Sequence, residues 1–215
     1  MSVSPPPAWP DERLSTGAAR LASRHQGHFS VETVQQLLTD SYRRLAEHAR
    51  VRTHLVVLAE RLTAERLDAL THTHTQTQTT GTGAAVRVLF VCGHNAGRSQ
   101  MAAALLAHRA GERVIVSSAG TDPAAEVEPH VAHALLESGL SVTDAYPKPL
   151  TSEVVEAADY VITMGCGDAC PVVSGRHYLN WSVADPDGAP ISVVRTILGD
   201  IDARITDLLA ALPDA

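Results

Sequence analysis

Residues 86–101, VRVLFVCGHNAGRSQM, contain the part of the sequence that decides the fold. A mostly apolar run from Val86 to Val91 predicts a buried strand that ends at Cys92. Five residues, GHNAG, separate this cysteine from Arg98, and the following stretch, rich in Ala and Leu, predicts a helix. The pattern is therefore a strand, a tight loop and a helix.

This pattern indicates an anion-binding loop beside a reactive cysteine. A short loop between a strand and a helix turns backbone N–H groups and the positive helix end toward one point. That point suits a tetrahedral oxyanion, which the Arg98 guanidinium can bind through two hydrogen bonds. The same donors favour the thiolate form of Cys92, which we predict to be a nucleophile. The alternative for Cys92 is a small residue that only packs in the core. The alternative for the loop is nucleotide binding, but it lacks both the Lys-Ser/Thr pair of a P-loop and the GxGxxG pattern.

The composition of the whole chain excludes several other classes of function. The 215 residues carry a formal net charge of −7, which does not favour a nucleic-acid surface. No apolar run approaches the roughly 20 residues that span a bilayer, and the Pro-rich start has no signal-peptide core. We therefore expect a cytoplasmic protein without a membrane partner. Thiols stay reduced there, so the three cysteines are expected to serve catalysis or redox exchange.

The N-terminal part of the chain predicts a small helical domain. Residues 1–10 are Pro-rich and predicted to be disordered, and residues 11–70 carry three helical apolar patterns that predict a three-helix bundle. Ser30 is expected to cap the second helix, and Thr63 to cap or break the third. So short a bundle is marginally stable alone. We interpret it as a stabilising or dimerising extension, through which the chain could form a homodimer.

Residues 71–85, THTHTQTQTTGTGAA, are polar and without apolar periodicity, so they predict a linker. His72 and His74 lie on this strip without a third ligand, and we predict no metal site there or elsewhere.

Residues 86–215 alternate predicted strands and helices. Such alternation predicts an α/β fold with an open parallel sheet, helices on both faces and a site at the carboxyl ends of the strands. Cys92 and the loop after Met164 both lie at such ends and are expected to meet. Besides the first strand, strands are predicted at residues 114–116 and 159–164, and helices at residues 99–110, 129–138, 154–158 and 191–212.

The loop after Met164 holds the two other cysteines, Cys166 and Cys170. Their spacing and their position at the edge of the site suit thiol–disulfide exchange, while a metal site would find only two ligands here. Further along, Asp185 precedes Pro186, which holds the carboxylate on a stiff turn from which it could protonate a leaving oxygen. The alternative is an ordinary Asp-Pro turn.

The run CGHNAGRSQM at residues 92–101 resembles the phosphate loop of the low-molecular-weight protein tyrosine phosphatase fold, and more closely the arsenate reductases built on that fold. The resemblance extends from about residue 86 to the C-terminus. It implies that Cys92 is the nucleophile, that Ser99 hydrogen-bonds its thiolate, and that Asn95 supports a left-handed turn. The residues that it implies for oxyanion binding are Gly93, His94, Asn95, Ala96, Gly97, Arg98 and Ser99.

In arsenate reductases that receive electrons from thioredoxin, a cysteine pair follows the strand that corresponds to residues 159–164 here. The resemblance therefore implies that Cys166 attacks the arsenylated Cys92, that Cys170 resolves the resulting disulfide, and that Asp185 is the general acid. Arsenate and thioredoxin would be the partners, and no cofactor would be needed.

Two departures separate the chain from the phosphatases of this fold. Gly97 stands where they usually carry a second cysteine, and Asp187 where they usually carry an aromatic residue. The alternatives that remain are a phosphatase, a reductase coupled to mycothiol or glutaredoxin, and an oxyanion sensor without turnover.

Overall fold

The computed structural model describes residues 11–78, 85–166 and 170–213. The chain divides into two compact units, Met1–Thr71 and His72–Ala215. The segment expected to be disordered, residues 1–10, lies outside the described residues. No helix in the described ranges is both long and apolar enough to cross a membrane.

The first unit contains the helices α1 (Asp11–Arg24), α2 (Val31–His48) and most of α3 (Leu55–Gln78). Ser30 caps α2 as predicted, because its hydroxyl accepts a hydrogen bond from the Thr33 N–H at 3.2 Å. The apolar positions that define the predicted helix faces are buried and form the core of this unit. They include Leu14, Ala18, Leu21, Val34, Leu38, Leu45, Leu55, Leu62 and Leu67.

The third helix differs from its prediction in two ways. Thr63 neither caps nor breaks α3: it is fully buried, and its hydroxyl donates to the Ala59 carbonyl at 2.7 Å, one turn back. The helix also continues to Gln78, so residues 71–78 are helical where a linker was expected. Extending a helix that already exists needs no new nucleation, and the Thr71 hydroxyl satisfies the Leu67 carbonyl at 2.9 Å. The remaining linker residues 79–84 lie outside the described residues.

The second unit is built on a four-stranded, fully parallel sheet with the order β2-β1-β3-β4. The strands are β1 (Val86–Cys92), β2 (Val114–Gly120), β3 (Tyr160–Met164) and β4 (His177–Asn180). The first three agree with the predicted strands. The edge strand β4 was not predicted from the sequence, because its four residues are mostly exposed and carry no apolar run.

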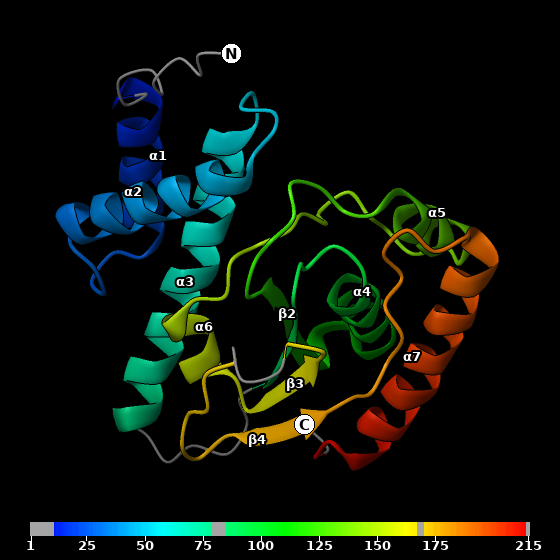
Figure 1. Ribbon diagram of the computed structural model, residues 1–215. Helices are drawn as coiled ribbons and strands as arrows, with labels where there is room; N and C mark the ends of the chain where they lie inside the picture. The colour runs from blue at the N-terminus through cyan, green and yellow to red at the C-terminus, as the bar shows by residue number, and fades with distance from the viewer. Residues whose placement is uncertain (1–10, 79–84, 167–169, 214–215) are drawn as a thin grey trace. The chain divides into compact units, whose positions relative to one another are not determined.

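Helices cover both faces of this sheet (Figure 1). On one face, α4 (Arg98–Ala110), α5 (Pro129–Glu137) and α7 (Ile191–Ala211) surround a core that includes Phe90 and Met101. A short 3-10 helix, η1 (Gly111–Arg113), follows α4. On the other face, α6 (Ser152–Ala157) packs against Leu89, Val91 and Val161. The prediction of an α/β fold with an open parallel sheet behind an N-terminal helical region is confirmed.

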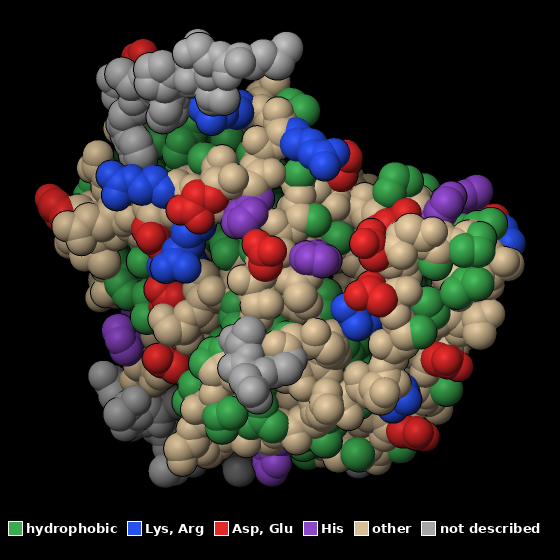
Figure 2. Space-filling view, viewed as in Figure 1, with side chains coloured by type: hydrophobic (Ala, Val, Ile, Leu, Met, Phe, Trp, Pro, Cys, Tyr) green, Lys and Arg blue, Asp and Glu red, His purple; other side chains and the backbone are tan. Residues whose placement is uncertain are grey.

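On the face of the molecule in Figure 2, acidic and basic side chains are interspersed. No continuous basic band crosses this visible face.

Candidate active site

The site lies where β1 ends. In the parallel register, Cys92 pairs with Gly120 of β2 and with Met164 of β3. Three strand ends therefore meet beside this cysteine, which is a free thiol with 2% of its surface exposed. The loop at residues 93–97 then turns the chain into α4.

The backbone of this loop is oriented by a second segment, residues 121–128, which the sequence did not identify. Four N–H groups of that segment donate to carbonyls at the end of β1 and in the loop over distances of 2.9–3.2 Å. Because a peptide group is planar and trans, each carbonyl that points outward turns the next N–H inward. The N–H groups turned inward thus lie in a cup, as an oxyanion site requires. The four carbonyls belong to Cys92, Gly93, His94 and Ala96.

Asn95 fixes the shape of the cup. It is fully buried and has a φ of 48°, which confirms the predicted left-handed turn. Its Oδ1 accepts from the Lys148 N–H at 2.8 Å and from Gln100 Nε2 at 3.2 Å. A backbone N–H can only donate, so this contact defines which amide atom is the oxygen. The other amide atom, Nδ2, donates to Ser99 Oγ at 2.8 Å.

This network positions hydrogen-bond donors at the reactive sulfur. Ser99 Oγ accepts from Asn95 Nδ2 and lies 3.0 Å from Cys92 Sγ, and toward a thiolate, which has no hydrogen to give, the serine hydroxyl is the donor. The Asn95 N–H donates to the same sulfur at 3.2 Å. Two donors directed at one sulfur suit a negatively charged thiolate. Gln100, which also bonds the Asn95 and Tyr146 carbonyls at 3.0 and 2.9 Å, supports this arrangement from the helix and was not predicted.

Arg98 and Asp185 meet at the open side of the cup. Arg98 Nη2 donates to Asp185 Oδ2 at 2.6 Å, and the side chain of Arg98 is only 12% exposed, against 52% for Asp185. The Asp187 N–H holds the other carboxylate oxygen at 3.3 Å. Pro186 lies against Gly97, where a side chain would collide with its ring. The turn that follows residue 184 therefore brings the predicted acid to the predicted oxyanion-binding arginine.

Gly165 connects the cup to the second cysteine loop. It has a φ of 74°, and a Cβ on it would come within 2.6 Å of Arg98 Nη1. Only glycine combines this conformation with so close an approach to the guanidinium. Cys166 is the next residue and begins its loop directly beside the arginine.

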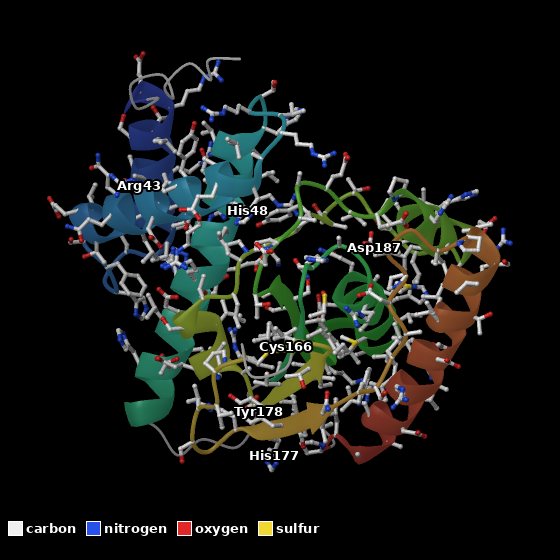
Figure 3. The ribbon with its side chains drawn as sticks, in the orientation of Figure 1. Arg43, His48, Cys166, His177, Tyr178 and Asp187 are labelled. Atoms are coloured by element: carbon white, nitrogen blue, oxygen red, sulfur yellow. A yellow bond between two sulfur atoms is a disulfide. The ribbon has the colours of Figure 1, made fainter. Side chains whose placement is uncertain are left out.

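Cys166 and Cys170 form a disulfide with a Cα–Cα distance of 6.1 Å (Figure 3). Both cysteines are partly buried against the cluster on the α6 face of the sheet. Cys92 belongs to the cluster on the opposite face. The structure therefore brings Cys92, Ser99, Arg98 and Asp185 together, whereas the cysteine pair follows the end of β3 and packs on the other face of the sheet.

Comparisons with known proteins agree with this geometry. The thioredoxin-dependent arsenate reductase Cg_ArsC1' of Corynebacterium glutamicum is 45% identical, with 92% of this chain and 95% of that chain covered and a TM-score of 0.82. The glutaredoxin arsenate reductase of Synechocystis sp. is 30% identical over 129 residues, which are 59% of this chain and 98% of the relative. The protein-arginine-phosphatase of Bacillus subtilis is 40% identical over 144 residues, 58% of this chain and 95% of the relative.

Two family models match separate parts of the chain. Residues 14–71 match the protein-tyrosine-phosphatase-like N-terminal domain. Residues 87–215 match the low molecular weight phosphotyrosine protein phosphatase. The second match contains the cup, the Asp185 turn and the cysteine pair, and it covers more than half of the chain. The chain therefore belongs to the low molecular weight phosphotyrosine protein phosphatase family.

Proposed function

We propose that this protein is an arsenate reductase that receives its electrons from thioredoxin. The observation that carries the proposal is a disulfide between Cys166 and Cys170 beside an anion cup in which Cys92 is free. A phosphatase needs the cup and an acid but has no use for a redox-active pair. The similarity to the thioredoxin-dependent arsenate reductase supports the same conclusion.

In the first step, arsenate binds in the cup as a tetrahedral oxyanion, held by the inward N–H groups of residues 93–97 and by Arg98. The Cys92 thiolate attacks arsenic, so a sulfur–arsenic bond forms and an arsenic–oxygen bond breaks. Asp185 lies at the open side of the cup, where it accepts from Arg98 at 2.6 Å; once it has taken up a proton from solvent, it gives that proton to the departing oxygen, which leaves as water. Ser99 stabilises the thiolate before the attack.

In the second step, the Cys166 thiolate attacks the sulfur of Cys92. A Cys92–Cys166 disulfide forms, and the electron pair of the broken sulfur–arsenic bond remains on arsenic, which is released as arsenite. Cys170 then attacks Cys166 and displaces the Cys92 thiolate. The products of this exchange are a free Cys92 and a Cys166–Cys170 disulfide, which is the set of sulfur states in the structure.

Thioredoxin then reduces the Cys166–Cys170 disulfide and is itself oxidised. The cycle needs two electrons for each arsenate and, in this proposal, neither a metal nor a bound cofactor. We place the reaction in the cytoplasm, where thioredoxin keeps thiols reduced.

We also propose that the N-terminal unit stabilises the protein or joins two copies of it. The proposal rests on the small size of this unit, since so short a helical bundle is only marginally stable alone. Sedimentation equilibrium of the full chain tests this, and a monomer at all concentrations contradicts the homodimer.

The decisive experiment is steady-state arsenate reduction with thioredoxin, thioredoxin reductase and NADPH. We expect arsenate-dependent NADPH oxidation that is lost in Cys92→Ser, Cys166→Ser and Cys170→Ser. Turnover with mycothiol or glutaredoxin that survives Cys170→Ser indicates the other reductant class. Hydrolysis of aryl phosphate without arsenate reduction indicates a phosphatase. Binding of arsenate without either reaction indicates a sensor.

A further inference from the structure

The loop between β3 and β4 carries both cysteines of the pair, and one side chain fixes its second half. Tyr178 is the second residue of β4 and pairs with Val161 of β3. Its hydroxyl donates to the Pro171 carbonyl at 3.0 Å and accepts from the Val173 N–H at 2.8 Å. These two partners lie one and three positions after Cys170, so the hydroxyl holds the chain immediately beyond the disulfide.

Tyr178 also belongs to the apolar surroundings of the disulfide. Its ring and both cysteines are partly buried against one cluster, which includes Leu89 and Val91 on the α6 face. Figure 3 labels Cys166 near the end of β3 and Tyr178 on the neighbouring strand β4. One residue of a regular strand therefore packs on the same cluster as the disulfide and holds the segment after Cys170 through its hydroxyl.

The two ends of the cysteine loop are held differently. Cys166 follows Gly165, where an added Cβ would collide with Arg98 of the cup, whereas Cys170 precedes the segment that Tyr178 holds on the α6 face. Cys92 lies in the cluster on the opposite face. For Cys166 to reach Cys92, it has to leave the α6 face, whereas the chain just beyond Cys170 is held there by Tyr178.

We propose that Tyr178 is a positioning residue for the disulfide relay: it anchors the Cys170 end of the loop and stabilises the oxidised pair on the α6 face. This inference rests on the proposed thioredoxin-coupled function. In this proposal Cys166 is the thiol that moves between Cys92 and Cys170, while Cys170 keeps its position and forms the disulfide there. The reaction affected is the reduction of the Cys166–Cys170 disulfide by the thioredoxin dithiol, which yields two thiols here and a disulfide in thioredoxin.

The test is Tyr178→Phe, which keeps the ring and removes both hydrogen bonds. Without these hydrogen bonds the Cys170 end of the loop gains conformational freedom in the dithiol, and closing the disulfide then has to remove that freedom, which disfavours the disulfide. We expect the equilibrium with thioredoxin to shift toward the dithiol by about tenfold, which equals a midpoint potential about 30 mV less negative. The exchange in which Cys166 changes its disulfide partner from Cys92 to Cys170 should slow as well. The Cys92–Cys166 intermediate should therefore accumulate, which rapid acid quench and mass spectrometry can detect.

The matched control is Tyr160→Phe, which removes a hydroxyl from the neighbouring strand β3, where the ring stacks on His177 with 5.0 Å between centroids. This variant should retain the wild-type potential. Binding of inorganic phosphate, which reports the cup alone, should be equal in wild type and both variants.

An unchanged potential and no accumulated intermediate in Tyr178→Phe overturn the inference. An equal shift in Tyr160→Phe also overturns it, since the effect would then be a general loosening of the sheet edge. The proposed function is tested separately, by the wild-type rate with arsenate and thioredoxin. If that rate is zero, the function fails, while the potential of the pair still decides the role of Tyr178.

Discussion

The contact between Gly97 and Pro186 yields a quantitative prediction about proton donation. A Cβ at residue 97 would come closer than 3.0 Å to Pro186 Cγ, whereas non-bonded carbons prefer about 3.5–4.0 Å. Gly97→Ala therefore pushes the Asp185 turn outward by about 1 Å. A displacement of that size in a reacting group costs on the order of 100-fold in rate. We expect kcat for arsenate reduction to fall by about this factor.

The measurement is steady-state NADPH oxidation with arsenate, thioredoxin and thioredoxin reductase. Gly199→Ala is the matched control, because it adds the same methyl group in α7 where no atom lies within 4 Å of the added Cβ. Alkylation of Cys92 by iodoacetamide needs no acid, so its rate in Gly97→Ala should stay close to wild type. This comparison separates a displaced proton donor from a damaged nucleophile.

The same prediction can be refuted by a double-mutant cycle. In an Asp185→Asn background the proton donor is already absent, so Gly97→Ala should cost little more. If the fall in kcat in the double variant equals the product of the two single-variant falls, residue 97 acts through something other than the acid. An unchanged kcat in Gly97→Ala alone would show that proton donation does not depend on the contact between Pro186 of the Asp185 turn and residue 97.

Three further predictions test the nucleophile, the relay and the helical unit. Ser99→Ala removes a charge-assisted donor from Cys92 and should slow its alkylation at neutral pH by about tenfold; an unchanged rate contradicts the direction assigned to that hydrogen bond. Cys170→Ser should permit one turnover and leave a Cys92–Cys166 disulfide, visible by mass spectrometry of peptides, and full multiple turnover would remove the relay. Burial raises the pKa of Asp40, but its hydrogen bonds with Arg44 and the buried Arg66 outweigh this and lower that pKa below 3.8. A carboxylate whose pKa is lowered by folding stabilises the fold at pH values above its pKa in the unfolded chain. This contribution is lost as the pH falls through the pKa in the folded protein. Because the Asp40 side chain is 42% exposed and solvent screens its ion pairs, Asp40→Asn should cost no more than about 1 kcal/mol in urea unfolding at pH 7 and progressively less at acid pH; a cost independent of pH contradicts the charge pairing.

The part of the site that could be predicted from the sequence is the part encoded locally. From Cys92 to Ser99 the chain makes one strand end, one loop and one helix start, so spacing alone relates the sulfur to the cup. The left-handed turn at Asn95 belongs to the same class, because few other residues tolerate a φ of 48°. The C-x3-C pair also follows a recognisable strand and forms the disulfide that its spacing suggested.

What could not be predicted depends on contacts between distant segments. The donors at residues 121–128 that turn the loop carbonyls outward have no motif of their own, since they act through backbone N–H groups. Gln100 looks like any polar residue in an Ala-rich helix until its three hydrogen bonds are seen. The strand β4 forms because β3 offers it an open edge, and its own sequence has little strand character.

Gly165 shows why the relay and the anion cup cannot be independent. It has a positive φ at the end of β3, and the same residue leaves room for Arg98 Nη1. In the proposed cycle Cys166 has to leave the α6 face to reach Cys92, and its neighbour Gly165 lies next to the Arg98 guanidinium. The same guanidinium donates to Asp185 through Nη2 and is the group that we propose to bind the oxyanion. One side chain therefore adjoins the acid, the proposed oxyanion site and the residue before the proposed attacking thiol, so we expect a substitution at Arg98 to affect both binding and relay.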